Sequence, residues 1–97
     1  MPLGVLFRPE AQAEALETRA WYAQREASLG EAFTAELAKA VSAIREHPLQ
    51  FTRVRGETRR VILNRFPYAV YFRVTEAEVI VLAVHGRQSP KQWRSRK

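Results

Sequence analysis

The chain has 97 residues, of which 46% are hydrophobic and 27% charged, and it contains no cysteine. This length excludes a two-domain enzyme, a Rossmann-size nucleotide fold and an eight-unit βα barrel, and the lack of cysteine excludes disulfides and thiolate metal sites. The net charge is +6. No apolar run reaches the ~20 residues that span a bilayer, and the start lacks a secretory signal pattern, so we expect a cytoplasmic protein without a membrane partner.

The positive charge is concentrated in the second half of the chain. Residues 1–50 hold five Lys or Arg and seven Glu, whereas residues 51–97 hold eleven Lys or Arg and three Glu. Arginine supplies most of this charge, and its planar guanidinium suits phosphate and carboxylate groups. The pattern therefore indicates either an anionic partner, such as a nucleic acid, a nucleic-acid enzyme, a ribosome or an acidic protein, or simply a soluble basic surface.

The first elements in chain order are a strand and a helix. Residues 3–8 are an apolar stretch that Pro9 ends, which predicts a short strand. Proline suits a first helical position, and the acidic Glu10 suits the positive end of a helix dipole. Gly30 is predicted to end this helix. Its apolar stripe is expected at Leu16, Ala20, Ala23 and Ala27.

A second helix follows Gly30 and is predicted to stop at His47, because the residue before Pro48 is pushed out of the α region. The short link at Gly30 makes the two helices antiparallel neighbours, an αα-hairpin. The apolar stripe of the second helix is expected at Phe33, Leu37, Ala40, Val41 and Ile44.

After a loop over residues 49–56, the sequence predicts three strands with short links. Alternation over 60–65 and β-forming residues over 69–74 and 79–84 indicate an antiparallel meander. The element order is β-α-α-β-β-β. We expect an α+β fold in which a two-helix hairpin packs on a small, mainly antiparallel sheet.

Few residues are suited to catalysis. The chain has no Asp and only two histidines, which argues against a Ser-His-Asp triad and against a zinc site. Its four glycines are isolated, so no phosphate-binding loop is present. We expect no metal and no cofactor.

Two groups of residues remain candidates for a site. Arg53, Arg55, Arg59, Arg60 and Arg65 follow the second helix, where they either contact an anionic partner or protect a sheet edge from aggregation. The second group is the segment 85–94. There His85 beside Arg87 would suit phosphodiester cleavage, or His85 is simply hydrogen-bonded at a strand end while Trp93 packs as an anchor.

Over nearly its whole length the chain resembles the RelE/ParE toxins of bacterial type II toxin–antitoxin modules, and it is closer to the ParE branch. The resemblance rests on the order and spacing of several stretches. In the helical half these are Ala20-Trp21-Tyr22, Leu29-Gly30-Glu31-Ala32-Phe33 and Glu46-His47-Pro48 with Phe51. In the second half they are Arg59-Arg60 through Arg65-Phe66-Pro67-Tyr68-Ala69-Val70-Tyr71-Phe72-Arg73-Val74, Val81-Leu82-Ala83-Val84-His85-Gly86-Arg87 and Pro90-Lys91-Gln92-Trp93. It implies one toxin domain over 1–97 with the β-α-α-β-β-β order.

The family divides in function, and the resemblance implies two alternatives. ParE-like members act against DNA gyrase, whereas RelE-like members cut mRNA on the ribosome. In the RelE pattern an arginine follows the Pro-Tyr pair, but here Ala69 follows it, and the closing position nearest Trp93 holds no acid or base. These departures favour a ParE-like gyrase inhibitor that is not an enzyme. For the ribonuclease alternative, the catalytic candidates are Arg60, His85 and Arg87.

Either alternative implies a partner, a ParD-like antitoxin that forms a hetero-oligomer with the toxin. Such antitoxins fold an acidic and apolar segment onto the toxin, and we expect an amphipathic helix to enter a groove between the helix hairpin and the sheet. Trp21, Tyr22 and Phe33 either contribute to this groove or belong to the core. The full set of candidate residues for binding target or antitoxin is Arg59, Arg60, Arg65, Arg87, Lys91, Trp93, Arg94, Trp21 and Tyr22.

Overall fold

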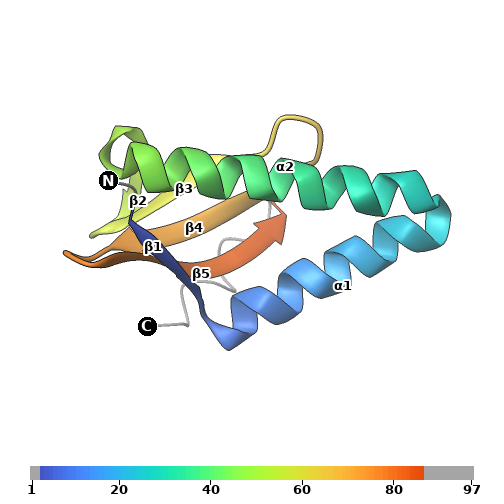
Figure 1. Ribbon diagram of the computed structural model, residues 1–97, viewed down its shortest axis with the longest axis horizontal. Coiled ribbons are helices and arrows are strands. Elements are labelled where there is room, and N and C mark those ends of the chain that lie inside the picture. The colour runs from blue at the N-terminus through green and yellow to red at the C-terminus, as the bar shows by residue number, and fades with distance from the viewer. Residues whose placement is uncertain (1–2, 87–97) are drawn as a thin grey trace.

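Two helices lie over one face of a five-stranded sheet in the computed structural model, which describes residues 3–86 (Figure 1). The predicted α+β architecture, a helix hairpin on a mainly antiparallel sheet, is confirmed. The elements are β1 (Gly4–Phe7), α1 (Pro9–Arg25), α2 (Ala27–Glu46), a short 3-10 helix η1 (Pro48–Gln50), β2 (Arg53–Arg55), β3 (Thr58–Ile62), β4 (Tyr68–Val74) and β5 (Glu78–Gly86).

The strands lie in the order β1-β5-β4-β3-β2. β1 runs parallel to β5, and the other neighbours are antiparallel. The tight turn between β4 and β5 is held by Thr75, whose hydroxyl accepts hydrogen bonds from the N–H groups of Ala77 and Glu78. The three strands of the predicted meander are present as β3, β4 and β5, which pair antiparallel in chain order.

The predicted loop over residues 49–56 is more ordered than the sequence indicated. It contains η1 and the short strand β2, which pairs with the start of β3. Gly56 closes the turn between β2 and β3 with a φ of 54°, a conformation that glycine adopts without strain. A strand of three residues has too few alternations for its periodicity to be recognised in a sequence.

The helix hairpin turns at Glu26 and not at the predicted Gly30. Glu26 is extended, with φ −163° and ψ 128°, and its N–H group donates to the Tyr22 carbonyl. Gly30 lies one turn inside α2, where a Cβ atom would stand 2.8 Å from Cβ of Ala23. The glycine therefore permits close packing of the two helices and does not end one of them.

The stripe predicted for α1 was also wrong. Leu16 is 57% exposed, and the three alanines of that stripe are exposed as well, although Ala23 lies next to Gly30 of α2. The buried side chains of α1 are Ala11 and Thr18, with Ala15 and Tyr22 half-buried. The stripe predicted for α2 is confirmed, since Phe33, Ala40 and Ile44 are buried and Leu37 and Val41 are half-buried.

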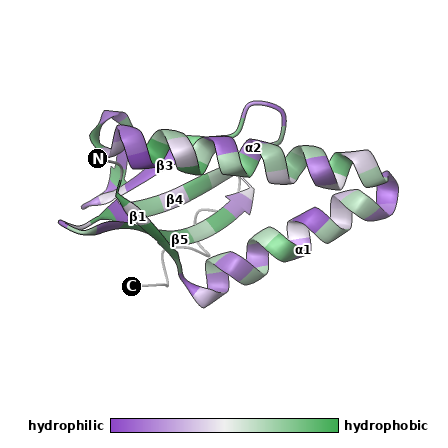
Figure 2. Ribbon diagram, in the orientation of Figure 1, coloured by the Kyte–Doolittle hydropathy of each residue, from purple (hydrophilic) through white to green (hydrophobic). Residues whose placement is uncertain are grey.

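The main core lies between the hairpin and the sheet. Figure 2 shows hydrophobic residues along β5 and α2, which enclose it. Its buried members are Ala11, Phe33, Ala40, Ile44, Leu63, Phe66, Val70, Phe72, Val79, Val81 and Val84. A smaller cluster of Ala69, Tyr71 and Ala83, with Val54 packed against it, is buried on the other face of the sheet. Within residues 3–86, no helix is both long and apolar enough to cross a membrane.

Candidate functional site

The candidate arginines gather on β2, β3 and the loop after β3. Arg59 pairs with Phe72 and therefore lies on the face of the sheet that the helices cover, whereas Arg60 pairs with Tyr71 on the opposite face. β2 lies outside β3, so β3 is not the edge strand that the sequence suggested. Edge protection therefore does not explain Arg59 and Arg60, whose backbones are both covered by β2 and the residue before it.

Arg59 has a defined structural role. Its guanidinium donates hydrogen bonds to the carbonyl oxygens of Phe51 at 2.7 Å and Leu49 at 3.3 Å. These bonds fasten the segment around η1 to β3. Part of the donor capacity of Arg59 is thus used inside the fold.

Arg60 instead borders an open pocket at the edge of the sheet, between β3 and the segment that precedes β2. The pocket has a volume of about 280 Å³ and is also lined by Gln50, Phe51, Thr52, Val61 and Ile62. The guanidinium of Arg60 has no hydrogen bond or ion pair to another described residue that would occupy it. Arg60 is therefore the candidate arginine best placed to meet an anionic group of a partner.

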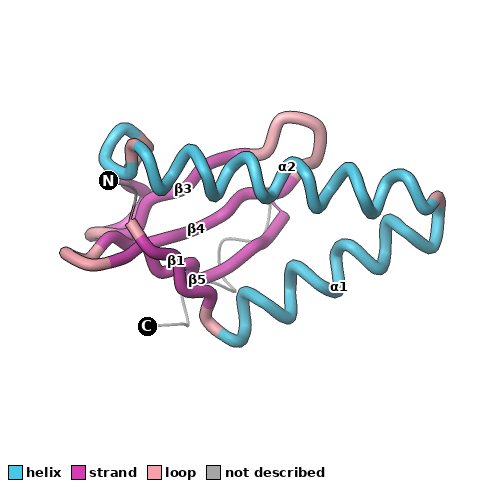
Figure 3. Tube along the Cα trace, in the orientation of Figure 1, coloured by secondary structure: helices cyan, strands magenta, loops and turns pink. Residues whose placement is uncertain are grey.

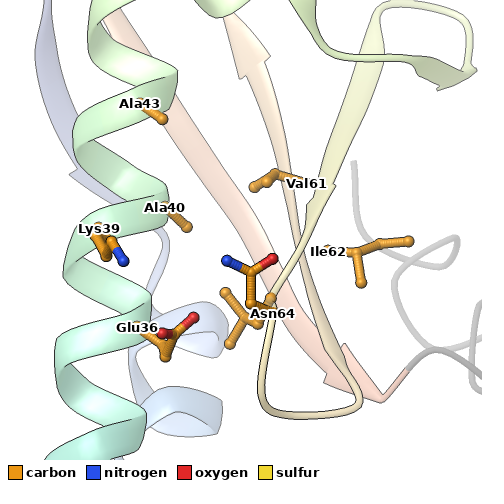
Figure 4. A pocket seen from close by; sticks show the side chains of 8 residues that line it. Glu36, Lys39, Ala40, Ala43, Val61, Ile62 and Asn64 are labelled. Carbon is orange, nitrogen blue, oxygen red and sulfur yellow. The ribbon is translucent and has the colours of Figure 1, made fainter.

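A second pocket opens between α2 and β3, where the sequence predicted a groove (Figure 4). In Figure 4, Ala40 and Ala43 on α2 and Val61 on β3 point into this space, while Ile62 points away from α2. Figure 3 shows the loop between β3 and β4 beside α2, and its residues Leu63 and Asn64 line the pocket. The volume is about 210 Å³, and the lining residues are Glu36, Lys39, Ala40, Ala43, Val61, Ile62, Leu63 and Asn64.

The three aromatic residues that the sequence associated with the groove lie elsewhere. Phe33 is fully buried, so its alternative assignment to the core is confirmed. Tyr22 is half-buried beside it, with ring centroids 6.0 Å apart. Trp21 is 48% exposed, and the guanidinium carbon of Arg25 lies 3.3 Å from its ring centroid, a cation–π contact. None of the three lines either pocket.

Burial also affects the hydroxyl group of Tyr22. Desolvation raises the pKa of Tyr22 above its usual value, nearby Tyr68 raises it further, and Arg25 partly opposes the shift. The phenol is therefore neutral at physiological pH, and its ring packs against Phe33 and Phe66.

His85 belongs to a small polar cluster at the end of β5. Its side chain is 6% exposed, and its Nε2 atom lies 3.2 Å from Oε2 of Glu14 on α1. The other carboxylate oxygen of Glu14 accepts a hydrogen bond from the Val84 N–H group at 2.8 Å. β1 pairs with β5 only as far as Val81, so Glu14 continues the row of hydrogen bonds along the edge of β5. The cluster fixes α1 to the sheet.

Glu14→Ala is expected to lower the free energy of unfolding by about 1–3 kcal/mol, because it leaves the part-buried Val84 N–H group without its acceptor. Glu14→Gln keeps an acceptor oxygen and is expected to lose less. Urea unfolding of the two variants at neutral pH measures the difference. Equal stability of Glu14→Ala and the wild type would contradict the proposed role of this carboxylate.

The remaining candidates are divided between the surface and the C-terminal segment. Arg65 is exposed in the loop between β3 and β4, with its guanidinium carbon 5.8 Å from the ring centroid of Phe66. Arg87, Lys91, Trp93 and Arg94 lie outside the described residues. Over residues 3–86, no three His, Cys, Asp or Glu side chains group in a way that could hold a metal ion.

Sequence reasoning missed the pocket residues Lys39, Asn64 and Ile62. Lys39 and Asn64 look like ordinary surface positions in a helix and a loop. Ile62 was assigned to a strand, but its exposure follows from the short length of β2, which the sequence did not predict. The sequence did contain one signal for Ile62. It lies two residues after Arg60, so in a strand the two side chains share one face, the face away from the helices.

Comparison with known proteins identifies the family of this chain. The family model described as "ParE toxin of type II toxin-antitoxin system, parDE" matches residues 5–90. A solved structure titled "Chromosomal ParDE TA system from P. aeruginosa" contains a chain with a similar fold, with a TM-score of 0.74 and 17% sequence identity. The match covers 87% of this chain and 95% of that chain. No curated protein matches this sequence.

Proposed function

Since the chain belongs to the ParE toxin family of type II toxin–antitoxin systems, we propose that this toxin inhibits DNA gyrase in the cytoplasm and that a cognate antitoxin neutralises it. The observation that carries the proposal is the family match over residues 5–90. The toxin then acts by binding its target and catalyses no reaction of its own.

The arrangement around His85 supports this proposal over the ribonuclease alternative. A general acid or base must reach the proton it transfers on the substrate. The His85 ring is almost completely buried, and its Nε2 atom faces the carboxylate of Glu14. Ala69, where the RelE pattern has an arginine, is fully buried. Of the ribonuclease candidates among the described residues, Arg60 borders one of the two pockets described above, and His85 borders neither of them.

For contact with gyrase or antitoxin we propose Arg60, Arg65 and Trp21 as the leading described residues. Arg60 borders the pocket at the edge of the sheet, Arg65 is exposed in the neighbouring loop, and about half of the Trp21 side chain is accessible. Arg59 and Tyr22 contribute to binding mainly by holding this surface in place. Arg87, Lys91, Trp93 and Arg94 stay candidates from the sequence.

The antitoxin is proposed to bind through an acidic and apolar segment. The pocket between α2 and β3 offers apolar side chains, and the second half of the chain carries an excess of positive charge. A segment that combines both properties would bury apolar surface and pair with the arginines when it folds onto the toxin.

A gyrase cleavage assay and an in-vitro translation assay, run side by side, test the proposed target. The purified toxin is expected to raise the amount of gyrase-cleaved DNA and to leave translation unchanged, and prior mixing with the antitoxin is expected to abolish the effect. Arg60→Gln is expected to require at least about tenfold more protein, because charge-assisted hydrogen bonds contribute about 1.5–3 kcal/mol.

Arg19→Gln is the matched control for this assay, since it removes the same charge from the exposed side of α1, away from both pockets. It is expected to act like the wild type. Ribosome-dependent cleavage of mRNA without any effect on gyrase would refute the proposal and establish the ribonuclease alternative. Equal loss in Arg19→Gln and Arg60→Gln would show that overall charge, and not Arg60, is responsible.

A further inference from the structure

Other described residues, within 3–86, cover the outer edge of β3 only in part. β2 pairs with β3 through Arg53 with Arg59 and Arg55 with Thr58. The last hydrogen bond on this side runs from the Arg60 N–H group to the Thr52 carbonyl, at 3.1 Å. Beyond it, no strand among residues 3–86 pairs with the outer side of β3.

The backbone of Ile62 faces this uncovered side. In an antiparallel strand, the N–H and C=O groups of one residue point to the same side, and those of the next residue point to the other side. The Arg60 N–H group points outward to Thr52, whereas the Leu63 N–H group points to Tyr68 next to β4. The N–H and C=O groups of Ile62 therefore point outward, and its side chain is 39% exposed.

Both pockets border β3 at Val61 and Ile62. Val61 and Ile62 line the pocket of about 210 Å³ beside α2 and also the pocket of about 280 Å³ beside Thr52. Side chains of an added strand would alternate between the two faces of the sheet. Those directed toward α2 would enter the space beside Ala40 and Ala43, which Figure 4 shows next to Val61.

The charges around this edge favour the binding of an acidic segment. Lys39 and Arg60 line the pockets, and Arg65 lies in the next loop, whereas Glu36 is the one acidic side chain among the pocket-lining residues. A second copy of this edge would bring like charges together, which opposes pairing between two toxin molecules. A segment with carboxylates and apolar side chains meets no such repulsion.

We propose that an extended acidic and apolar segment of the antitoxin adds as a strand to the outer edge of β3 and pairs with the backbone of Ile62. A helix in the same groove would satisfy its own backbone groups and would leave those of Ile62 unpaired, whereas an added strand pairs them. The inference rests on the proposed neutralisation by an antitoxin. It changes the expected conformation of the bound segment from helix to strand.

Amide hydrogen exchange of the wild-type toxin, alone and with its purified proposed antitoxin, tests this inference directly. Exchange at the Ile62 amide is expected to slow at least about tenfold in the complex, because the N–H group gains a hydrogen bond of about 1.4 kcal/mol or more. The Arg60 amide, which is already bonded to Thr52, is the internal reference.

Two variants at this position separate the backbone from the side chain. Ile62→Pro removes the outward N–H group and no hydrogen bond to β4, and Ile62→Ala removes most of the side chain but keeps the N–H group. Ile62→Pro is expected to bind the antitoxin about tenfold more weakly than Ile62→Ala does. Thermal unfolding of both variants confirms that each is folded at the assay temperature.

The outcomes distinguish this inference from the proposed function. If the antitoxin binds but the Ile62 amide exchanges as fast as in the free toxin, the added strand is refuted and neutralisation by an antitoxin stands. Equal affinity of the two variants would refute the strand in the same way. If the antitoxin does not bind the wild-type toxin, both proposals fail.

Discussion

Phe33→Ala is expected to lower the free energy of unfolding by about 3–5 kcal/mol, the range for deleting a buried aromatic side chain. Phe33 is fully buried on α2, and its ring lies 5.5 Å from the centroid of Phe66 and 5.8 Å from that of Tyr68. Tyr22 of α1 completes the cluster. The phenylalanine therefore connects both helices to the sheet, and its loss leaves a cavity between them.

Urea unfolding followed by circular dichroism measures this effect. Trp21→Ala is the matched control, because it removes a larger aromatic side chain from a half-exposed position on α1. We expect Trp21→Ala to cost no more than about 1 kcal/mol, as surface substitutions usually do. Equal losses for the two variants would contradict the assignment of Phe33 to the core and of Trp21 to the surface.

Gly30→Ala is expected to destabilise the toxin by about 1–3 kcal/mol through overpacking, although alanine is the better helix former by about 1 kcal/mol. A Cβ atom at this position would lie 2.8 Å from Cβ of Ala23 and 3.2 Å from the carbonyl oxygen of Arg19. The two helices would have to separate to relieve these contacts, and the packing of the whole hairpin would change.

The double variant Gly30→Ala with Ala23→Gly isolates the contact. Removing Cβ of Ala23 takes away the nearest obstacle, so the two substitutions are expected to be less harmful together than the sum of the single effects. Thermal and urea unfolding of the two single variants and the double variant provide the measurement. A stabilising Gly30→Ala would show that the helices are not in close contact here.

The candidate site was only partly predictable. The basic residues of the β2–β3 region are visible in the sequence, but the different roles of Arg59 and Arg60 are not. Adjacent positions on a strand face opposite ways, and which face the helices cover depends on contacts with distant residues. Arg59 bonds to the carbonyls near η1, while Arg60 borders an open pocket.

Local sequence patterns predict the types and order of both helices and of β1, β3, β4 and β5, but not η1 or β2, because strand and helix periodicities are local properties that only longer elements display. The sequence by itself identified the α2 stripe, the β4 and β5 strands and the resemblance to the toxin family. The rotation of α1 was decided only in the tertiary structure. Many small and apolar residues on α1 made several faces acceptable, and packing of Tyr22 against Phe33 and Phe66 selected one of them.

Contacts between distant parts of the chain were likewise decided only by the tertiary structure. Glu14 and Val84 are 70 positions apart, and no local pattern predicts that a helical carboxylate replaces a missing strand partner. Among the described residues, the end of the β2–β3 pairing before Ile62 depends on where β2 stops, and the place of Gly30 depends on how closely two helices approach. The physical reason is the same in each case: periodicity indicates the type of an element, whereas its rotation, register and close contacts depend on the partner element.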